Sequence, residues 1–235
     1  SAHQKKSPSL SIDGLSCRDV SVTFDGATMT PERVTFDLAS GGLAITGANG
    51  SGKTSLLLAL LGLVPHRGEI VVGQSGAQSL SDFSERVFWL PQSPYTDPRA
   101  SIGFHLGGMG LREVSDAEAL EALRAVGLED VLLSRARAKG VSLAGLPMES
   151  LSGGEQRRVM LARLRLADVD LVLLDEPEAA LDEEGRTRLR RMLEELAASR
   201  RVIVIAHDPS IIPASFARLE VQRSRPSNST GSDGA

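Results

Sequence analysis

The chain has 235 residues, of which 41% are hydrophobic and 24% are charged, and its formal net charge at pH 7 is −4. This is ordinary globular composition, and it excludes an overall positive field that would attract nucleic acid or an anionic membrane surface. The longest apolar run, residues 56–64, is much shorter than the roughly 20 residues of a membrane-spanning helix, and the single Cys17 excludes an internal disulfide.

Short apolar runs alternate with helical patterns along the chain, which predicts an α/β fold built on a mostly parallel sheet. Two of the runs, in residues 170–174 and 201–206, are continuously apolar, as expected for strands covered on both faces. The clearest predicted strands are residues 43–46, 86–90, 170–174 and 201–206.

Two helices are also readable from the sequence. One has apolar residues at helical spacing on one face and charged residues opposite, which predicts a helix packed on a sheet. Ser115, followed by Glu118 three residues later and by Gly127, predicts a second helix with a capping box, within a mostly helical middle part. The apolar residues of the first helix are Leu189, Met192, Leu193 and Leu196.

A glycine-rich segment reads GANGSGKT at residues 47–54, directly after a predicted strand and directly before a helix-forming run. This is the P-loop pattern, in which backbone N–H groups surround a phosphate at a helix N-terminus. We expect Lys53 to reach the β- and γ-phosphates of a nucleoside triphosphate, the hydroxyl of Thr54 to ligate Mg²⁺, and Ser55 to cap the same turn. The predicted nucleotide-binding residues of the loop are Gly47, Ala48, Asn49, Gly50, Ser51, Gly52, Lys53, Thr54 and Ser55.

Three polar residues follow the last two buried strands. Asp175 is expected at the end of a strand beside the P-loop strand, where it would hold Mg²⁺. The adjacent Glu176 is the natural general base for an attacking water, and His207 can donate a hydrogen bond to the γ-phosphate. These residues predict hydrolysis of the nucleotide.

The segment LSGGEQRR at residues 151–158 lies between the P-loop and the LVLLDEP run. It resembles the signature sequence of ATP-binding cassette (ABC) ATPases, and the resemblance covers roughly residues 10–222. The resemblance implies a P-loop NTPase (RecA-like) core with a mostly parallel sheet, an N-terminal antiparallel β subdomain and a helical subdomain that carries the signature. The implied boundaries are about 10–92 and 160–222 for the core and about 93–159 for the helical subdomain, with flexible tails at 1–9 and 225–235.

The resemblance also implies roles for residues outside the P-loop. Gln92 is similar to the Q-loop glutamine that contacts Mg²⁺, Asp182 belongs to a D-loop-like AALD, and His207 resembles the switch histidine. Phe24 lies where the family has an aromatic ring that stacks on adenine. The signature residues Ser152, Gly153, Gly154 and Glu155 are implied to contact ATP held by a second nucleotide-binding domain in a head-to-tail dimer.

One segment departs from the family pattern. Glu178 and Ala179 stand where the family commonly has Thr-Ser, so hydrogen bonding after Glu176 is expected to differ. The catalytic residue types are all present, which predicts an active ATPase.

The resemblance implies the ATP-binding and ATP-hydrolysing subunit or domain of an ABC transporter, with ATP and Mg²⁺ as cofactors. Its expected partners are a membrane-spanning chain or domain and a second nucleotide-binding domain, in a homodimer or a heterodimer, with no nucleic acid. The expected location is the cytoplasmic face of the cell membrane, and the expected docking segment is residues 93–110, with Tyr95, Phe104 and Leu106 exposed.

Several alternatives stay open at this point. The apolar residues of the docking segment could instead pack the helical subdomain, and export is favoured only slightly over import. Two other functional classes are a soluble, non-transport ABC ATPase and a regulatory module that holds ATP without hydrolysing it. The acidic net charge and the pairing of Glu176 with His207 argue against these two classes.

Overall fold

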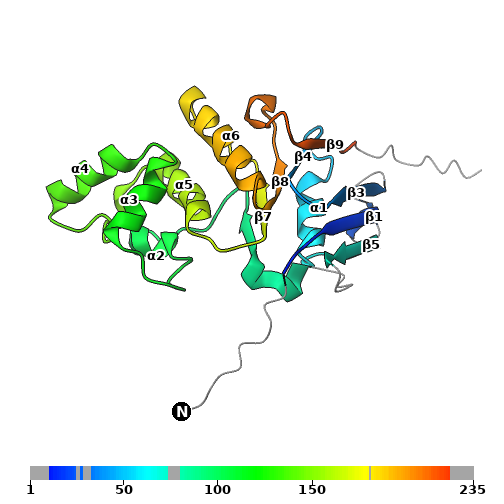
Figure 1. Ribbon diagram of the computed structural model, residues 1–235, viewed down its shortest axis with the longest axis horizontal. Helices are drawn as coiled ribbons and strands as arrows, with labels where there is room; N and C mark the ends of the chain where they lie inside the picture. The colour runs from blue at the N-terminus through cyan, green and yellow to red at the C-terminus, as the bar shows by residue number, and fades with distance from the viewer. Residues whose placement is uncertain (1–10, 25–26, 29–32, 74–79, 180, 223–235) are drawn as a thin grey trace, which may run out of the picture.

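A computed structural model describes residues 11–24, 27–28, 33–73, 80–179 and 181–222. The tails that the sequence predicts at residues 1–9 and 225–235 lie outside these ranges. Figure 1 shows two sheets and their covering helices on one side of the molecule, and a group of helices drawn in green on the other.

The N-terminal part of the chain forms an antiparallel sheet. Its first strand pairs with each of the other three, and the pairing register shifts between Cys17 and Val20. This confirms the predicted antiparallel β subdomain. The strands are β1 (Leu15–Phe24), β2 (Ala27–Thr28), β3 (Val34–Leu38) and β5 (His66–Val72).

The central sheet has the strand order β6-β7-β8-β4-β9, and all of its pairs are parallel. Because the carboxyl ends of parallel strands meet at one edge, the segments that follow β4, β6, β7 and β8 converge there. One expectation is wrong: β7, which ends at Asp175, does not lie beside the P-loop strand β4, because β8 is inserted between them. The strands are β4 (Gly42–Thr46), β6 (Val87–Leu90), β7 (Leu171–Asp175), β8 (Arg201–Ile205) and β9 (Ala217–Glu220).

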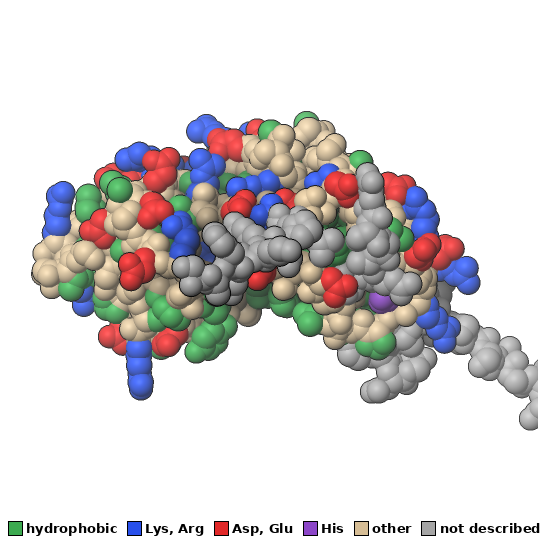
Figure 2. All heavy atoms as spheres, turned by 60° about the horizontal axis from the view of Figure 1, so that its bottom comes forward, with side chains coloured by type: hydrophobic (Ala, Val, Ile, Leu, Met, Phe, Trp, Pro, Cys, Tyr) green, Lys and Arg blue, Asp and Glu red, His purple; other side chains and the backbone are tan. Residues whose placement is uncertain are grey.

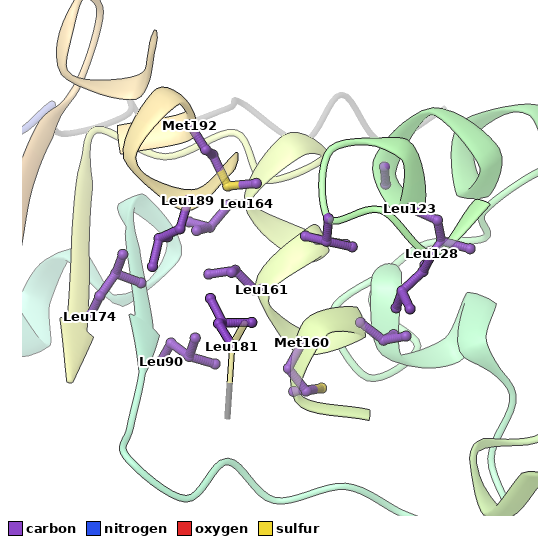
Figure 3. Packing of buried hydrophobic residues seen from close by; sticks show 14 of the residues in the cluster. Leu90, Leu123, Leu128, Met160, Leu161, Leu164, Leu174, Leu181, Leu189 and Met192 are labelled. Atoms are coloured by element: carbon purple, nitrogen blue, oxygen red, sulfur yellow. The ribbon is translucent and has the colours of Figure 1, made fainter. Parts of the chain in front are cut away.

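Helices α1 (Lys53–Leu60) and α6 (Glu183–Ala197) bury their apolar residues in two different hydrophobic clusters. Alternate residues of β7 and β8 belong to these two clusters, as expected for strands that bury both faces. The predicted amphipathic helix is therefore confirmed, with Leu189, Met192, Leu193 and Leu196 all buried. Figure 3 shows labelled side chains from β6, β7, α5 and α6 gathered in the cluster that contains the α6 residues.

The helical part consists of α2 (Ile102–Leu106), α3 (Asp116–Arg124), α4 (Glu129–Lys139) and α5 (Gly153–Ala162). The predicted capping box at Ser115 is present: its hydroxyl accepts a bond from the N–H of Glu118, and the Glu118 carboxylate accepts one from the N–H of Ser115. Short 3₁₀ helices lie at Leu80–Arg86, Met148–Ser150, Arg163–Arg165 and Pro209–Ile211.

The charge and the exposed apolar residues of the described surface can be compared with the partners that the sequence predicts. Figure 2 shows acidic and basic side chains interspersed over the face that it draws, in line with the small net charge. Within the described ranges, no helix is both long enough and apolar enough to cross a membrane. Tyr95 and Phe104 are 71% and 40% exposed, as predicted, whereas the expectation for Leu106 is wrong, because it packs into the core at 3% exposure.

Candidate active site

The P-loop connects the carboxyl end of β4 to the first turn of α1. Gly50 and Gly52 have φ angles of 72° and 92°, and Gly52 is the N-cap residue of α1 without a side-chain cap. Ser55 therefore does not cap this turn, contrary to expectation, and the N–H groups of the first turn are left for an anion. At Gly47, with φ 144°, a Cβ atom would clash with the carbonyl oxygen of Val221. The path of the loop thus requires glycine at this position.

Lys53 is the cation of the loop. Its side chain is 6% exposed, and its Nζ donates to the carbonyl oxygens of Gly47 and Ala48 at 2.9 and 3.0 Å. Both acceptors are neutral backbone groups, so these bonds do not neutralise the ammonium charge. A phosphate bound in the loop would meet a nearly buried positive charge.

Thr54 and Asp175 face each other across the site. The Oγ1 of Thr54 donates to Oδ2 of Asp175 at 2.9 Å, and Asp175 is 1% exposed, with no partner for its buried Oδ1 among the described residues. Burial raises the pKa of Asp175. An unpaired carboxylate oxygen beside a hydroxyl fits a hard cation such as Mg²⁺, which takes oxygen ligands. Among the described residues, no group of three or more His, Cys, Asp and Glu is arranged so that it could hold a metal ion.

Glu176 follows β7 and is held from two sides. The Nε2 of Gln92 donates to its Oε2 at 2.6 Å, and Nε2 of His207 lies 2.6 Å from its Oε1. The φ angle of Glu176 is 50°, a left-handed conformation that costs a non-glycine residue about 1–3 kcal/mol. The loops after β6 and β8 thus fix the carboxylate of a strained residue.

Lys53, Thr54, Gln92, Glu176 and His207 share one cleft of about 450 Å³, and Asp175 contacts it through its hydrogen bond from Thr54. It contains the phosphate-binding loop together with the carboxylate that could activate a water, which is the arrangement that phosphoryl transfer to water needs. The residues that line it are Asn49, Gly50, Gly52, Lys53, Thr54, Ser55, Gln92, Glu176 and His207.

The signature segment lies outside the lining of this cleft. Ser152 caps α5 in a capping box with Glu155, whose carboxylate also pairs with Arg135 at 2.9 and 3.0 Å. Hydrogen bonding to Arg135 lowers the pKa of Glu155. The nucleotide contacts expected of Ser152, Gly153, Gly154 and Glu155 stay a prediction.

Three other residues that the sequence predicted to bind nucleotide are Asp182, Phe24 and Ser51. Asp182 caps α6, with its Oδ1 accepting a bond from the N–H of Gly185 at 2.7 Å. Phe24 ends β1, and its side chain lies outside the described part of the chain. Ser51 is buried, and its Oγ has no partner among the described atoms.

Two residues that the sequence did not indicate as part of the site form hydrogen bonds with its backbone. Arg157 of α5 donates through Nη1 to the carbonyl oxygen of Gln92 at 2.5 Å and through Nη2 to that of Glu176 at 2.6 Å. Glu178 accepts bonds from the backbone N–H groups of His207 and Asp208. The departure at Glu178 was visible in the sequence, but nothing in the pattern around Arg157 showed that its side chain turns toward Glu176.

Comparison with known proteins identifies the family of the chain. The family described as "ABC transporter" matches residues 32–179. The chain is 36% identical over 220 residues to the cytochrome c biogenesis ATP-binding export protein CcmA of Sodalis glossinidius, covering 89% of this chain and 93% of that protein. It is 32% identical over 213 residues to the energy-coupling factor transporter ATP-binding protein EcfA2 of Streptococcus sanguinis, covering 83% and 72%.

Solved structures share the fold. A bacterial Atm1-family ABC exporter with ATP bound superposes with a TM-score of 0.77 at 22% identity, over 94% of this chain and 40% of that chain. An ATP-binding protein from Pyrococcus furiosus, described as a putative ABC transporter, superposes with a TM-score of 0.70 at 24% identity, over 88% and 97%. The chain therefore belongs to the family of ABC transporter ATPases, which couple ATP hydrolysis to transport.

Proposed function

We propose that this chain binds ATP with Mg²⁺ in the cleft described above, hydrolyses it within a dimer of nucleotide-binding domains, and drives export through a membrane-spanning partner. The observation that carries the proposal is one cleft that is lined by the P-loop and by Gln92, Glu176 and His207 from the segments that follow β6, β7 and β8. Thr54 in this cleft also donates a hydrogen bond to the buried Asp175.

Different residues of the cleft bind the phosphates, hold Mg²⁺ and transfer the proton. Lys53 and the N–H groups of the P-loop bind and orient the phosphates, and Thr54 and Asp175 are placed to hold Mg²⁺, which would neutralise phosphate charge when bound. Glu176 orients a water and accepts its proton, while His207 donates to the γ-phosphate. A general base of this kind contributes about 10²- to 10⁴-fold to the rate.

The signature segment supports a dimer. Gly153 and Gly154 begin α5 outside the lining of the cleft of the same chain, and a helix N-terminus suits an anion. In a head-to-tail pair, this helix end would meet the nucleotide held by the second domain. The two domains would then enclose two ATP molecules, which also gives Glu155 its predicted place at the interface.

A groove of about 300 Å³ supports a membrane-spanning partner. It lies beside the predicted docking segment, and its wall includes Leu111, which is 90% exposed, and Phe88, whose ring lies 5.3 Å from the guanidinium carbon of Arg163. The groove combines these apolar residues with charged ones, among them Glu85, Arg112 and Asp168, and such a surface suits a short amphipathic helix. Docking there would hold the chain at the cytoplasmic face of the membrane.

The direction of transport is proposed from the relatives. CcmA proteins of several bacteria are named export proteins, and they match at 32–36% identity over most of this chain. We therefore propose export.

The partner is tested by affinity purification of the tagged chain from detergent-solubilised cells, beside Leu111→Asp and the exposed control Glu194→Gln. We expect a polytopic membrane protein in stoichiometric amount with wild type and Glu194→Gln, and its loss with Leu111→Asp. Recovery of the chain from the soluble fraction, with ribosomal or DNA-bound proteins or with no partner, would contradict the transport proposal and leave the ATPase intact.

A further inference from the structure

Glu178 is a buried acidic residue that the hydrolytic chemistry does not use directly. Its side chain is 6% exposed, although it follows Glu176 by only two positions. Its Oε1 accepts hydrogen bonds from the N–H of His207 at 2.7 Å and from the N–H of Asp208 at 3.2 Å. The backbone that carries the switch histidine is thus attached to the segment that carries the general base.

Residues 176–178 contact both the side chain and the main chain of His207. Glu176 contacts the imidazole through Oε1, 2.6 Å from Nε2, while Glu178 binds the main chain of His207. Pro177 lies between these two acidic residues and is buried, and proline fixes its own φ angle. The ring of His207 is otherwise exposed, since 40% of its side chain faces solvent.

A carboxylate is suited to this task. Hydrogen bonds from backbone N–H groups to an ionised acceptor are shorter and about twice as strong as those to a neutral acceptor. Burial lowers the pKa of Arg157, and the charge of Glu178 is the first of those that oppose this shift, so the guanidinium lies near the Glu178 carboxylate. A buried carboxylate with a cation nearby avoids part of the cost of an isolated buried charge.

We propose that Glu178 is a positioning residue for hydrolysis, which holds the main chain at residues 207 and 208 so that the ring of His207 stays in contact with Glu176 and aimed into the cleft. The proposal rests on the function proposed above, because it assumes that His207 acts on bound ATP. It assigns a role to the position at which this chain departs from the Thr-Ser of its family.

The first test compares Glu178→Met with Glu178→Gln. Methionine has a similar shape but cannot accept the two N–H bonds, whereas the amide oxygen of glutamine can. We expect Glu178→Met to lower kcat at least about 10-fold, and by no more than the roughly 10²- to 10⁴-fold contribution of an acid–base group, with KM for ATP within about 2-fold of wild type. Glu178→Gln should restore most of the lost kcat.

The second test is a double-mutant cycle with His207→Ala. If Glu178 acts through His207, Glu178→Met should lower kcat by less than about 2-fold in the His207→Ala background, because the group that it positions is already gone. A full additive loss in that background would overturn the proposal, as would wild-type kcat in folded Glu178→Met. If Glu178→Met does not fold, Glu178→Leu, which also lacks an acceptor, replaces it in both tests with the same expectations.

Asp116 provides a matched control. Its carboxylate also accepts bonds from two consecutive backbone N–H groups, those of Leu143 and Ala144, but it lies in the helical part, away from the cleft. Asp116→Asn should leave kcat within about 2-fold of wild type, and an equal loss there would refute a specific role for Glu178. The failure of the proposed function is distinguishable, because His207→Ala would then leave hydrolysis unchanged in the otherwise wild-type chain.

Discussion

Arg157 ties the helix that carries the signature to the catalytic segment, and its loss is predicted to slow hydrolysis. Its two Nη atoms donate to the carbonyl oxygens of Gln92 and Glu176, the residues that also meet through their side chains. Arg157→Met keeps the apolar part of the side chain and removes both bonds. Glu176 then loses a backbone restraint on its left-handed conformation.

The size of the effect follows from two energies of similar magnitude. A hydrogen bond from a charged donor is worth about 1.5–3 kcal/mol, and the left-handed conformation of Glu176 costs about 1–3 kcal/mol. Without the bond, Glu176 is free to relax away from its position in the cleft. A loss of about 1.5–3 kcal/mol in the transition state corresponds to a fall in kcat of roughly 10- to 150-fold.

The assay is steady-state phosphate release, with ATP affinity measured separately by equilibrium binding. We expect Arg157→Met to lower kcat and leave ATP affinity within about 3-fold of wild type, since Arg157 does not line the cleft. Arg190→Met, at an exposed position of α6, serves as the control for the loss of one positive charge. Folded Arg157→Met with wild-type kcat would refute the reasoning.

Three further predictions concern the loop, the cation and acid stability. Gly47→Ala should abolish ATP binding in an equilibrium titration, because its Cβ would clash with the carbonyl oxygen of Val221, and wild-type affinity would count against the loop geometry. Wild type should bind ATP more tightly with Mg²⁺ than with EDTA, and Asp175→Asn should remove this difference in affinity. An unchanged difference would show that Asp175 does not hold the cation. The pKa of Glu118 is lowered from 4.5 to about 2, first by its hydrogen bond from Arg112, so its stabilising effect is present above pH 4.5 and is lost as the pH falls toward 2. Thermal unfolding of Glu118→Gln should therefore differ from wild type more at pH 6 than at pH 2, and an equal difference at both would contradict the assignment.

Much of the fold could be predicted because local patterns and burial agree. The continuously apolar runs became β7 and β8, with every residue of β7 buried, and the capping box at Ser115 formed as its spacing indicated. Strand order could not be predicted in this way. That β8 lies between β4 and β7 depends on long-range pairing, which apolar runs alone do not encode.

The candidate site could be predicted where function requires a residue type at a fixed spacing. The P-loop, Asp175, Glu176 and His207 were predicted for that reason, whereas Gln92 was predicted from the family resemblance, and the structure places them around one cleft or at its edge. Hydrogen bonds between side chains and the backbone could not be predicted. Arg157 donates to backbone carbonyl groups and Glu178 accepts from backbone N–H groups, and the sequence does not show which of these common groups a side chain will reach. The exposure of Leu106 was also misjudged, because its neighbours Tyr95 and Phe104 remain exposed while it turns into the core.

The proposed function depends on Glu176 as the base for ATP hydrolysis in this cleft. The decisive measurement is phosphate release from wild type and Glu176→Gln with Mg²⁺ and saturating ATP, in the presence of the membrane partner, with Glu194→Gln as the control. We expect Glu176→Gln to lower the rate about 10²- to 10⁴-fold while ATP stays bound, and Glu194→Gln to match wild type. A rate for Glu176→Gln equal to that of wild type would contradict this role of Glu176.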